Sequence, residues 1–258
     1  MNKYLLENDN EYERLNFQNK IDAYDIKKEM NQLVFHANDK VLDAGCGNGN
    51  LIEELLKIKK LNIHGIDMCE DRVIMSKERF KGFSNVEIFR GSLENTNLPK
   101  KSYDKICCRY IFEHVTNPLD ILKELRSLLV DKGYLYIVNM DQVFFGFHTK
   151  NEKFNKDLKM LQNSLPQDYE IGRKLPQLLM QSGYKNVDWS AQTYFFKGEN
   201  LTLERKNSEM RLTQMRDYLS AKFRSIEQYD EFAATYLSEM DDPNNVLFMS
   251  KFIIKALG

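Results

Sequence analysis

The sequence predicts an α/β fold in which helices cover both faces of a doubly wound, mostly parallel sheet. Short apolar segments alternate with helical patterns from Lys40 to Asp141, as in chains built from strand-helix-strand units. The chain has 258 residues, of which 42% are hydrophobic and 29% are charged, a composition typical of globular proteins. We therefore expect one large domain around a seven-stranded sheet, with helical segments before and after it.

The expected strands are short apolar runs, as is usual where both faces of a parallel sheet are buried. Five of them fall in the alternating segment, a sixth follows the helical pattern GRKLPQLLMQSG, and the last one lies near the end of the chain. Their residues are 41–45, 61–67, 86–91, 103–110, 134–141, 187–196 and 246–257.

Two helices are expected between these strands from the spacing of their apolar residues. Leu51, Ile52 and Leu55 form the stripe of the first, and the second extends from Pro118 to just before Gly133. Proline in the first turn and glycine after the last turn are common helix boundaries. In a parallel sheet the carboxyl ends of the strands share an edge, and we expect the ligand there.

The chain divides into four expected parts. Residues 1–39 form a helical N-terminal arm, residues 40–200 the ligand-binding core, residues 201–240 an inserted helical cap, and residues 241–258 the closing strand of the sheet. The cap is inferred because about 40 helical residues separate two expected strands, and compact domains seldom contain structureless loops of that length.

The charge balance argues against a polyanionic partner. The 37 Lys and Arg residues nearly cancel the 38 Asp and Glu residues, which leaves a net charge of -1, so no strong overall field attracts nucleic acid or an anionic membrane. No apolar run approaches the roughly 18 residues of a spanning helix, and the first residues lack the order of a secretory signal. We expect a cytoplasmic location.

The four cysteines do not form a metal-binding pattern. Cys46, Cys69, Cys107 and Cys108 contain no pair of two-residue-spaced clusters, which a zinc site of this type requires. The adjacent Cys107 and Cys108 lie in an apolar run, where cysteine usually packs as a small hydrophobic residue. We expect buried free thiols and no metal.

The strongest local signal is the glycine-rich segment VLDAGCGNGN, residues 41–50, between the first strand and the first helix. Gly45, Gly47 and Gly49 permit close approach of a ligand to the backbone, although an ordinary glycine turn is the alternative. The spacing G-x-G-x-G differs from that of a dinucleotide fingerprint. Asp67 follows Gly47 by 20 residues at the end of the second strand. An acid there accepts hydrogen bonds from ribose hydroxyls, which suits any ribose-containing cofactor. Because the phosphate contacts of the dinucleotide fingerprint are missing, a nucleoside without phosphates is favoured.

Four segments together resemble the class I S-adenosylmethionine-dependent methyltransferases. They are VLDAGCGNGN, GIDM, RGSLENTNLPKKSYDKICCRYIFEHV and LKELRSLLVDKGYLYIVNMD, in this order over about residues 40–141. Two flanking segments, EYERLNFQ and IGRKLPQLLMQSGYKNV, are also similar to segments of the small-molecule members. The resemblance implies a Rossmann-like methyltransferase fold, S-adenosylmethionine as cofactor and S-adenosylhomocysteine as product.

The resemblance also assigns expected roles to residues of the glycine loop and the second strand. Gly45, Cys46 and Gly47 would approach the methionine part of the cofactor through their backbone. Asp43 would anchor its amino group, and Asp67 would hold its ribose.

Further expected contacts follow from the same resemblance. Met68 would pack on the adenine, and Ser92 and Leu93 would bound its far edge. Many members have Asp where this chain has Ser92, so the contact with the adenine amino group is weaker or made differently.

The resemblance also implies three candidate partners for the cofactor carboxylate. They are Arg109, just beyond the fourth strand, and Arg14 and Gln18 in the arm. For Arg14, a solvated helix arginine is the alternative.

Methyl transfer needs little acid-base catalysis by the protein. The sulfonium methyl is already activated, so the main requirements are alignment of the nucleophile and exclusion of water. A hydroxyl or carbon acid needs a proton acceptor. His148 and His114 are the candidates, with a structural role for His114 and an ordinary loop position for His148 as the alternatives.

The leading hypothesis is transfer of a methyl group to N, O or C of a small molecule, with no nucleic acid and no membrane as partner. The alternatives are methylation of a protein or RNA, a non-catalytic regulator that binds S-adenosylmethionine, and a nicotinamide dehydrogenase of similar architecture.

Overall fold

Residues 9–58 and 60–258 are described by the computed structural model, and their contacts group them into two units. The sheet unit contains Ile26–Asn139, Ile171–Ala191 and Phe252–Gly258, and the helical unit contains the described residues up to Asp25, Met140–Glu170 and Gln192–Lys251. Residues 1–8 of the expected arm lie outside the described residues. The four expected parts of the chain stay a prediction, since this grouping divides the chain at other residues.

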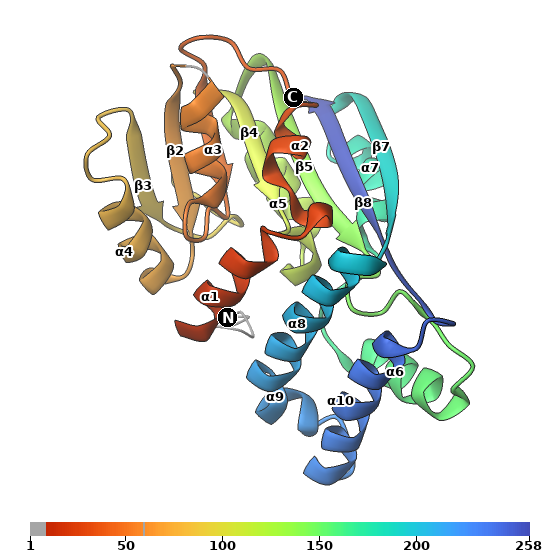
Figure 1. Cartoon of the computed structure of the whole chain (residues 1–258). Coiled ribbons are helices and arrows are strands. Elements are labelled where there is room, and N and C mark those ends of the chain that lie inside the picture. The colour runs from red at the N-terminus through yellow and green to blue at the C-terminus, as the bar shows by residue number, and fades with distance from the viewer. Residues whose placement is uncertain (1–8, 59) are drawn as a thin grey trace. The chain divides into compact units, whose positions relative to one another are not determined.

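The expected mostly parallel sheet is present, and β1 to β4 belong wholly to the sheet unit, whereas β5, β7 and β8 each have residues in both units (Figure 1). The strand order is β3-β2-β1-β4-β5-β8, and β7 pairs with β8. The pairs β1 with β2, β1 with β4, β2 with β3 and β4 with β5 are all parallel. The strands are β1 (Lys40–Ala44), β2 (Asn62–Asp67), β3 (Val86–Arg90), β4 (Tyr103–Arg109), β5 (Leu129–Asp141), β7 (Lys185–Phe195) and β8 (Val246–Leu257).

Helices cover both faces of this sheet, which confirms the doubly wound arrangement (Figure 1). On β4, Ile106 and Cys108 pack with one set of helices, and Cys107 packs with the other. This alternation is that of a strand with both faces buried. One face carries α2 (Ile26–Met30), α3 (Asn50–Ile58) and α4 (Glu70–Arg79), and the other carries α5 (Pro118–Leu128) and α7 (Ile171–Gln181).

The junction between α5 and β5 differs from the expectation. The helix ends at Leu128 rather than just before Gly133, and the strand begins five residues early, at Leu129 instead of residue 134. Tyr103 pairs with Leu129, whereas Lys105 pairs with Tyr134, so the residues between Leu129 and Tyr134 form an irregularity in the ladder. Lys132 has a left-handed φ of 68° within it. The backbone is therefore extended but bulged where a helical turn was expected.

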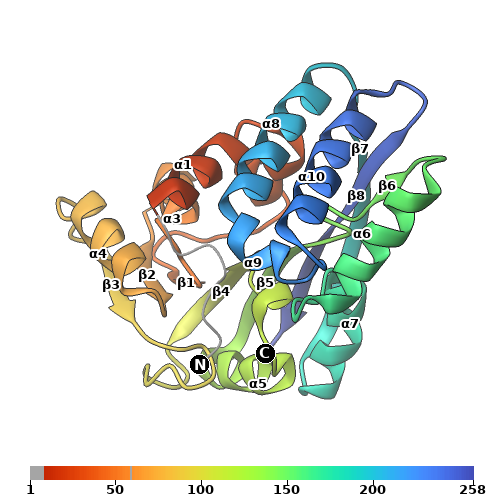
Figure 2. The ribbon, with the colours of Figure 1, turned by 90° about the horizontal axis from the view of Figure 1, so that it is seen from below.

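The helical unit consists mainly of helices packed in parallel rows (Figure 2). Its α8 packs against α1 and α10, and α10 also packs against α6. Phe154, Phe232 and Tyr236 join α6 and α10 through ring contacts. The helices are α1 (Asp9–Gln18), η1 (Asp22–Tyr24), α6 (Glu152–Ser164), α8 (Gly198–Gln214), α9 (Arg216–Ser220) and α10 (Ile226–Asp241).

One short strand was not expected. Phe147 and His148 form β6, which pairs antiparallel with Leu247 and Val246 of β8, so the described residues contain one strand more than the predicted seven. Phe144 and Phe145, which precede this strand, are buried. Phe144 stacks on Tyr236 with ring centroids 4.3 Å apart. Among the described helices, none has the length and apolar character needed to cross a membrane.

Candidate functional site

The glycine loop connects the end of β1 to the start of α3 at the carboxyl edge of the sheet. Gly45, Gly47 and Gly49 all have left-handed φ angles, of 81°, 52° and 81°, which explains why glycine is required. A Cβ at Gly45 would stand 2.2 Å from Ile111, and one at Gly49 would stand 2.3 Å from the ring of Phe80. Among the described residues, no heavy atom lies within 4 Å of the same position at Gly47. Two glycines therefore permit close packing, whereas no described residue packs against this position of Gly47.

Asp67, the last residue of β2, accepts hydrogen bonds from the glycine loop and from Cys69, the residue before α4. Its Oδ2 accepts a hydrogen bond from the Gly47 amide at 2.8 Å, and its Oδ1 accepts one from the Cys69 amide at 2.9 Å. A carboxylate oxygen has two lone pairs, so within the described part of the chain each oxygen keeps one direction in which it can accept a further hydrogen bond. The carboxylate is thus oriented by the backbone and suited to bind two neighbouring hydroxyls of a ligand.

Helix α4 also supports the glycine loop, through hydrogen bonds to two of its carbonyls. Ser76 Oγ donates to the Gly47 carbonyl at 2.8 Å, and Arg79 donates to the Asn48 carbonyl at 2.8 Å. Ser76 and Arg79 share one face of α4 because they are three residues apart. Both loop carbonyls are held by α4, while the Gly47 amide donates to Asp67.

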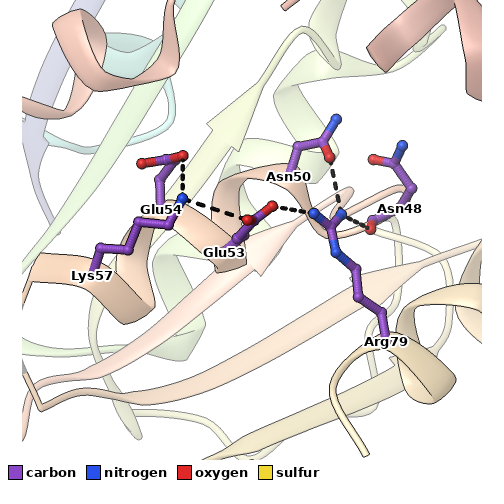
Figure 3. A network of polar contacts seen from close by, with 6 residues as sticks. All are labelled: Asn48, Asn50, Glu53, Glu54, Lys57 and Arg79. Atoms are coloured by element: carbon purple, nitrogen blue, oxygen red, sulfur yellow. Dashed lines mark hydrogen bonds and ion pairs between the residues drawn. The ribbon is translucent and has the colours of Figure 1, made fainter.

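The Arg79 guanidinium also reaches the first turns of α3 (Figure 3). It donates to Asn50 Oδ1 at 3.0 Å and pairs with Glu53. Glu53 contacts Lys57 in turn, at 3.4 Å. The sequence reasoning missed both Ser76 and Arg79. Their three-residue spacing on a helix that follows Asp67 was the available signal.

Asp43 is a buried acid with an unsatisfied oxygen. Its side chain lies in β1 and is 2% exposed, and its Oδ2 has no hydrogen-bond partner among the described residues. Burial, followed by the negative charge of Asp67, raises the pKa of Asp43 to about 7, and Arg109 opposes that change. A cationic hydrogen-bond donor bound next to Asp43 would satisfy this oxygen and favour its ionised form.

Arg109, the last residue of β4, is fixed by an acid that the sequence reasoning missed. Its Nε donates to Glu29 of α2 at 2.6 Å, and the Tyr110 hydroxyl donates to the other oxygen of Glu29 at 2.7 Å. The guanidinium also lies 4.2 Å from the centre of the Tyr110 ring. Glu29 orients Arg109, but its position in a polar helix 80 residues earlier gave no local signal.

The other expected residues of the glycine loop and of the adenine edge differ in their exposure. Cys46 is buried, and burial raises the pKa of its thiol, which keeps it neutral. Met68 is 49% exposed directly after β2. Ser92 is exposed, and its hydroxyl accepts a hydrogen bond from the Glu94 amide at 3.2 Å. Leu93 packs against the core on the α5 side of the sheet.

The expectation of buried free thiols is confirmed for three of the four cysteines. Cys46, Cys107 and Cys108 are free and buried, as expected. The fourth, Cys69, is free but only partly buried, because it follows Asp67 at the edge of the sheet rather than lying inside a strand.

The two candidate bases lie in different units. His114 ends the short helix η2 (Phe112–His114) of the sheet unit, and its Nε2 is 3.8 Å from Glu113. His148 is exposed in β6 of the helical unit. Neither arrangement identifies a base, so both assignments stay predictions.

Arg14 and Gln18 also belong to the helical unit. Arg14 is 3% exposed and donates to Gln18 at 2.6 Å and to Asn207 at 2.9 Å. The alternative of a solvated helix arginine is therefore wrong. The sheet unit contains the other expected cofactor residues, Asp43, Gly45, Cys46, Gly47, Asp67, Met68, Ser92, Leu93 and Arg109.

Comparison with known proteins agrees with this geometry. A family described as "Methyltransferase domain" matches residues 35–200. The mitochondrial ubiquinone biosynthesis O-methyltransferase of Saccharomyces cerevisiae is 32% identical over 137 residues, which are 48% of this chain and 42% of that protein. The malonyl-[acyl-carrier protein] O-methyltransferase of Halalkalibacterium halodurans is 26% identical over 134 residues, 50% of this chain and 49% of that protein. The match thus spans under half the length of these curated relatives.

A solved structure shows the same fold at low identity. The phosphoethanolamine N-methyltransferase 2 of Haemonchus contortus, in complex with phosphomonomethylethanolamine and S-adenosylhomocysteine, superimposes with a TM-score of 0.56 and 15% identity. The alignment covers 95% of this chain and 52% of that one. Since the family match includes well over half of the sequence and contains the glycine loop, Asp67 and Arg109, this chain belongs to the methyltransferase domain family.

Proposed function

We propose that the protein is an S-adenosylmethionine-dependent methyltransferase that acts on a small molecule. The observation that carries the proposal is Asp67, whose carboxylate is held by two backbone amides and keeps one acceptor direction on each oxygen. Family membership supports the reaction class. The name of the Saccharomyces cerevisiae relative, which refers to ubiquinone biosynthesis, supports a small acceptor.

The residues of the sheet unit fit the nucleoside and amino-acid parts of this cofactor. Asp67 would accept hydrogen bonds from the two ribose hydroxyls, and the unsatisfied Oδ2 of Asp43 would accept one from the ammonium group. The open side of Gly47 leaves room for the cofactor against the backbone. Met68 and Leu93 would contact the adenine, with Ser92 at its edge.

The cofactor carboxylate needs a positively charged or amide donor. Arg109 is the candidate in the sheet unit, and Glu29 takes its Nε donor while orienting the rest of the guanidinium. Arg14 and Gln18 are the candidates from the helical unit. These assignments are part of the proposal.

The chemistry follows from the cofactor and from the position of the acceptor. Bound S-adenosylmethionine supplies a methyl group activated by the sulfonium charge. The protein has to align the acceptor atom with this methyl group and exclude water. For a hydroxyl or carbon acceptor, His148 or His114 would take the proton.

The near-zero net charge supports a small acceptor over a nucleic acid. A cytoplasmic location is also part of the proposal, and cell fractionation tests it.

Calorimetry with S-adenosylhomocysteine tests the proposal. We expect the wild type to bind it, and Asp67→Ala to lose at least about 100-fold in affinity, because two hydrogen bonds to a charged group are removed. The matched control is Asp188→Ala, since Asp188 is exposed in β7. No binding by the wild type, or equal binding by Asp67→Ala, would contradict the cofactor assignment.

Two further measurements separate the alternatives. Binding of S-adenosylhomocysteine without methyl transfer to any of a panel of small molecules, proteins and RNA would favour the non-catalytic regulator. Tighter binding of a nicotinamide dinucleotide would favour a dehydrogenase.

A further inference from the structure

The amino edge of the sheet unit carries a pocket that the cofactor site does not use. The pocket has a volume of about 300 Å³, at the small end of the range for small-molecule sites. It lies where β4 and β5 begin, whereas Arg109 ends β4 at the opposite edge. Since β4 has seven residues, about 20 Å separates its two ends. We call this the Arg126 pocket, and its polar lining residues are Lys101, Lys123, Arg126, Ser127, Asp131 and Ser182.

Arg126, in the last turn of α5, is positioned by packing against the residues that follow α7. A Cβ at Gly183 would stand 3.1 Å from Nη1 of Arg126 and 3.7 Å from its Nε. Gly183 has a left-handed φ of 86°, as is common just after a helix end. Because glycine has no side chain, the guanidinium approaches the backbone closely there.

The guanidinium of Arg126 has no acceptor in the described part of the chain. Its Nε is shielded from solvent and has no hydrogen-bond partner there. Within residues 9–58 and 60–258, Arg126 donates no side-chain hydrogen bond, and no carboxylate, that of Gly258 included, lies within 4.0 Å of it. A guanidinium has five N–H donors, and leaving such donors unpaired away from water is costly. The arrangement points to an acceptor that binds from the pocket.

The charge of the pocket is positive. Its lining contains three cationic side chains, Lys101, Lys123 and Arg126, and one carboxylate, that of Asp131. Lys101 pairs with Asp131 at 3.2 Å, and Lys123 pairs with Asp120 at 3.5 Å. All four of these side chains are more than half exposed, and ion pairs of this kind contribute little to stability. Both lysines can therefore exchange these partners for a bound anion.

The two serines of the lining offer acceptors rather than donors. Ser127 Oγ donates to the Glu124 carbonyl at 2.5 Å, and Ser182 Oγ donates to the Leu178 carbonyl at 2.8 Å. A hydroxyl has one proton and two lone pairs, so each serine oxygen can accept a hydrogen bond from a ligand. The pocket thus offers donors to an anionic group and acceptors to neutral hydroxyls beside it.

We propose that the Arg126 pocket binds a phosphate group, either as inorganic phosphate or as part of a small hydroxylated molecule. A planar guanidinium binds phosphate through two parallel hydrogen bonds. A phosphate group carries about two negative charges near neutral pH and has three strong acceptor oxygens, which matches one arginine flanked by two lysines. The site lies at the edge of the sheet opposite to Arg109, so this inference does not rest on the proposed function.

Calorimetry of the full chain at constant ionic strength tests the proposal, with inorganic phosphate and glycerol 3-phosphate as probes. We expect saturable binding of at least one of them. Tighter binding of glycerol 3-phosphate would assign the site to a phosphorylated small molecule, and equal or tighter binding of inorganic phosphate would assign it to the ion itself. If neither probe shows saturable binding, the proposal is wrong.

Arg126→Gln should weaken phosphate binding at least about tenfold, because a charged pair of hydrogen bonds is lost. The matched control is Arg216→Gln, which removes the same charge from a partly exposed arginine paired with Asp230 and should bind as the wild type does. A cation in the last turn also stabilises a helix, so urea unfolding is measured alongside. Lower stability with unchanged phosphate binding would show that Arg126 acts only on the end of α5, and would overturn the proposal.

Hydrogen exchange of the wild type locates the site without a substitution, which covers the case that Arg126→Gln fails to fold. Phosphate-dependent protection is expected in residues 126–131 and 182–184, which border the pocket. Protection confined to the glycine loop or to the helical unit would overturn the assignment to this pocket.

S-adenosylhomocysteine in the same titrations separates this inference from the proposed function. At saturation it should leave the phosphate affinity unchanged, and displacement of phosphate would show that phosphate binds in the cofactor site and overturn the assignment. Binding of S-adenosylhomocysteine without phosphate binding would refute only the phosphate site. Phosphate binding without S-adenosylhomocysteine binding would refute only the proposed function.

Discussion

The backbone amide of Gly47 donates a hydrogen bond to the Asp67 carboxylate at 2.8 Å. This bond connects the loop after β1 to the last residue of β2, strands that pair in parallel through Asp43 and Gly65. The acid is therefore oriented before any ligand arrives, which reduces the entropy cost of binding. A substitution in the glycine loop should therefore displace the Asp67 carboxylate, and a substitution of Asp67 should change the conformation of the loop.

Alanine should mainly reduce stability at Gly45 and mainly reduce cofactor affinity at Gly47. Gly45→Ala should lower the free energy of unfolding by about 2 to 4 kcal/mol, because the methyl group collides with Ile111 and the left-handed φ is strained. Gly47→Ala should cost only about 1 kcal/mol, from its φ alone. Its methyl group would enter the open space, so it should lower the affinity for S-adenosylhomocysteine. Urea unfolding and calorimetry measure the two effects. Equal loss of stability in both variants would contradict this difference.

Arg79 is predicted to be a positioning residue for the cofactor loop. Arg79→Ala removes the hydrogen bonds to Asn48 and Asn50, so the affinity for S-adenosylhomocysteine should fall about tenfold, roughly the effect of one or two such bonds. Unfolding stability should fall by only about 1 kcal/mol, because the pair with Glu53 is partly exposed. Lys57→Ala, which removes only exposed contacts in the same network, is the control (Figure 3). If both variants bind equally well, Arg79 does not position the loop.

Asp43 should make stability depend on pH. Its folded pKa of about 7 lies above the usual 3.8, so the folded state binds more protons than the unfolded chain between these values, and stability falls as the pH rises from about 4 to 7. Asp43→Asn should therefore raise the free energy of unfolding at pH 8 by about 2 to 4 kcal/mol and have much less effect near pH 4. Thermal or urea unfolding across this range measures the effect, with Asp188→Asn as control. If the free energy of unfolding has the same pH dependence in the wild type and in Asp43→Asn, then Asp43 has an ordinary pKa and the prediction is wrong.

His148 is predicted to affect turnover rather than cofactor binding. Once an acceptor is identified, His148→Ala should lower kcat, whereas the affinity for S-adenosylhomocysteine should not change. Lys150→Ala, two residues away and also exposed, is the control. Unchanged turnover in His148→Ala would remove this residue from the mechanism.

The sequence predicted the sheet and the glycine loop because both depend on local patterns. Apolar runs and the G-x-G-x-G spacing are properties of adjacent residues. The partners of Arg79 and Arg109 lie 26 to 80 residues away, and such pairs form only when helices pack on the sheet. The early start of β5 also depends on tertiary structure, since it is the partner Tyr103 that keeps Leu129 extended.

Burial was the other property that local patterns did not predict. Arg14 is polar and lies on a polar helix, but α8 supplies Asn207 as its partner and excludes water.

The most direct test of the central claim is a crystal structure of the protein with S-adenosylhomocysteine. We predict that both ribose hydroxyl oxygens lie about 2.6 to 3.0 Å from the Asp67 carboxylate oxygens, while the hydrogen bonds from Gly47 and Cys69 persist. A nucleoside bound elsewhere, with Asp67 contacting only these two amides, would contradict the account.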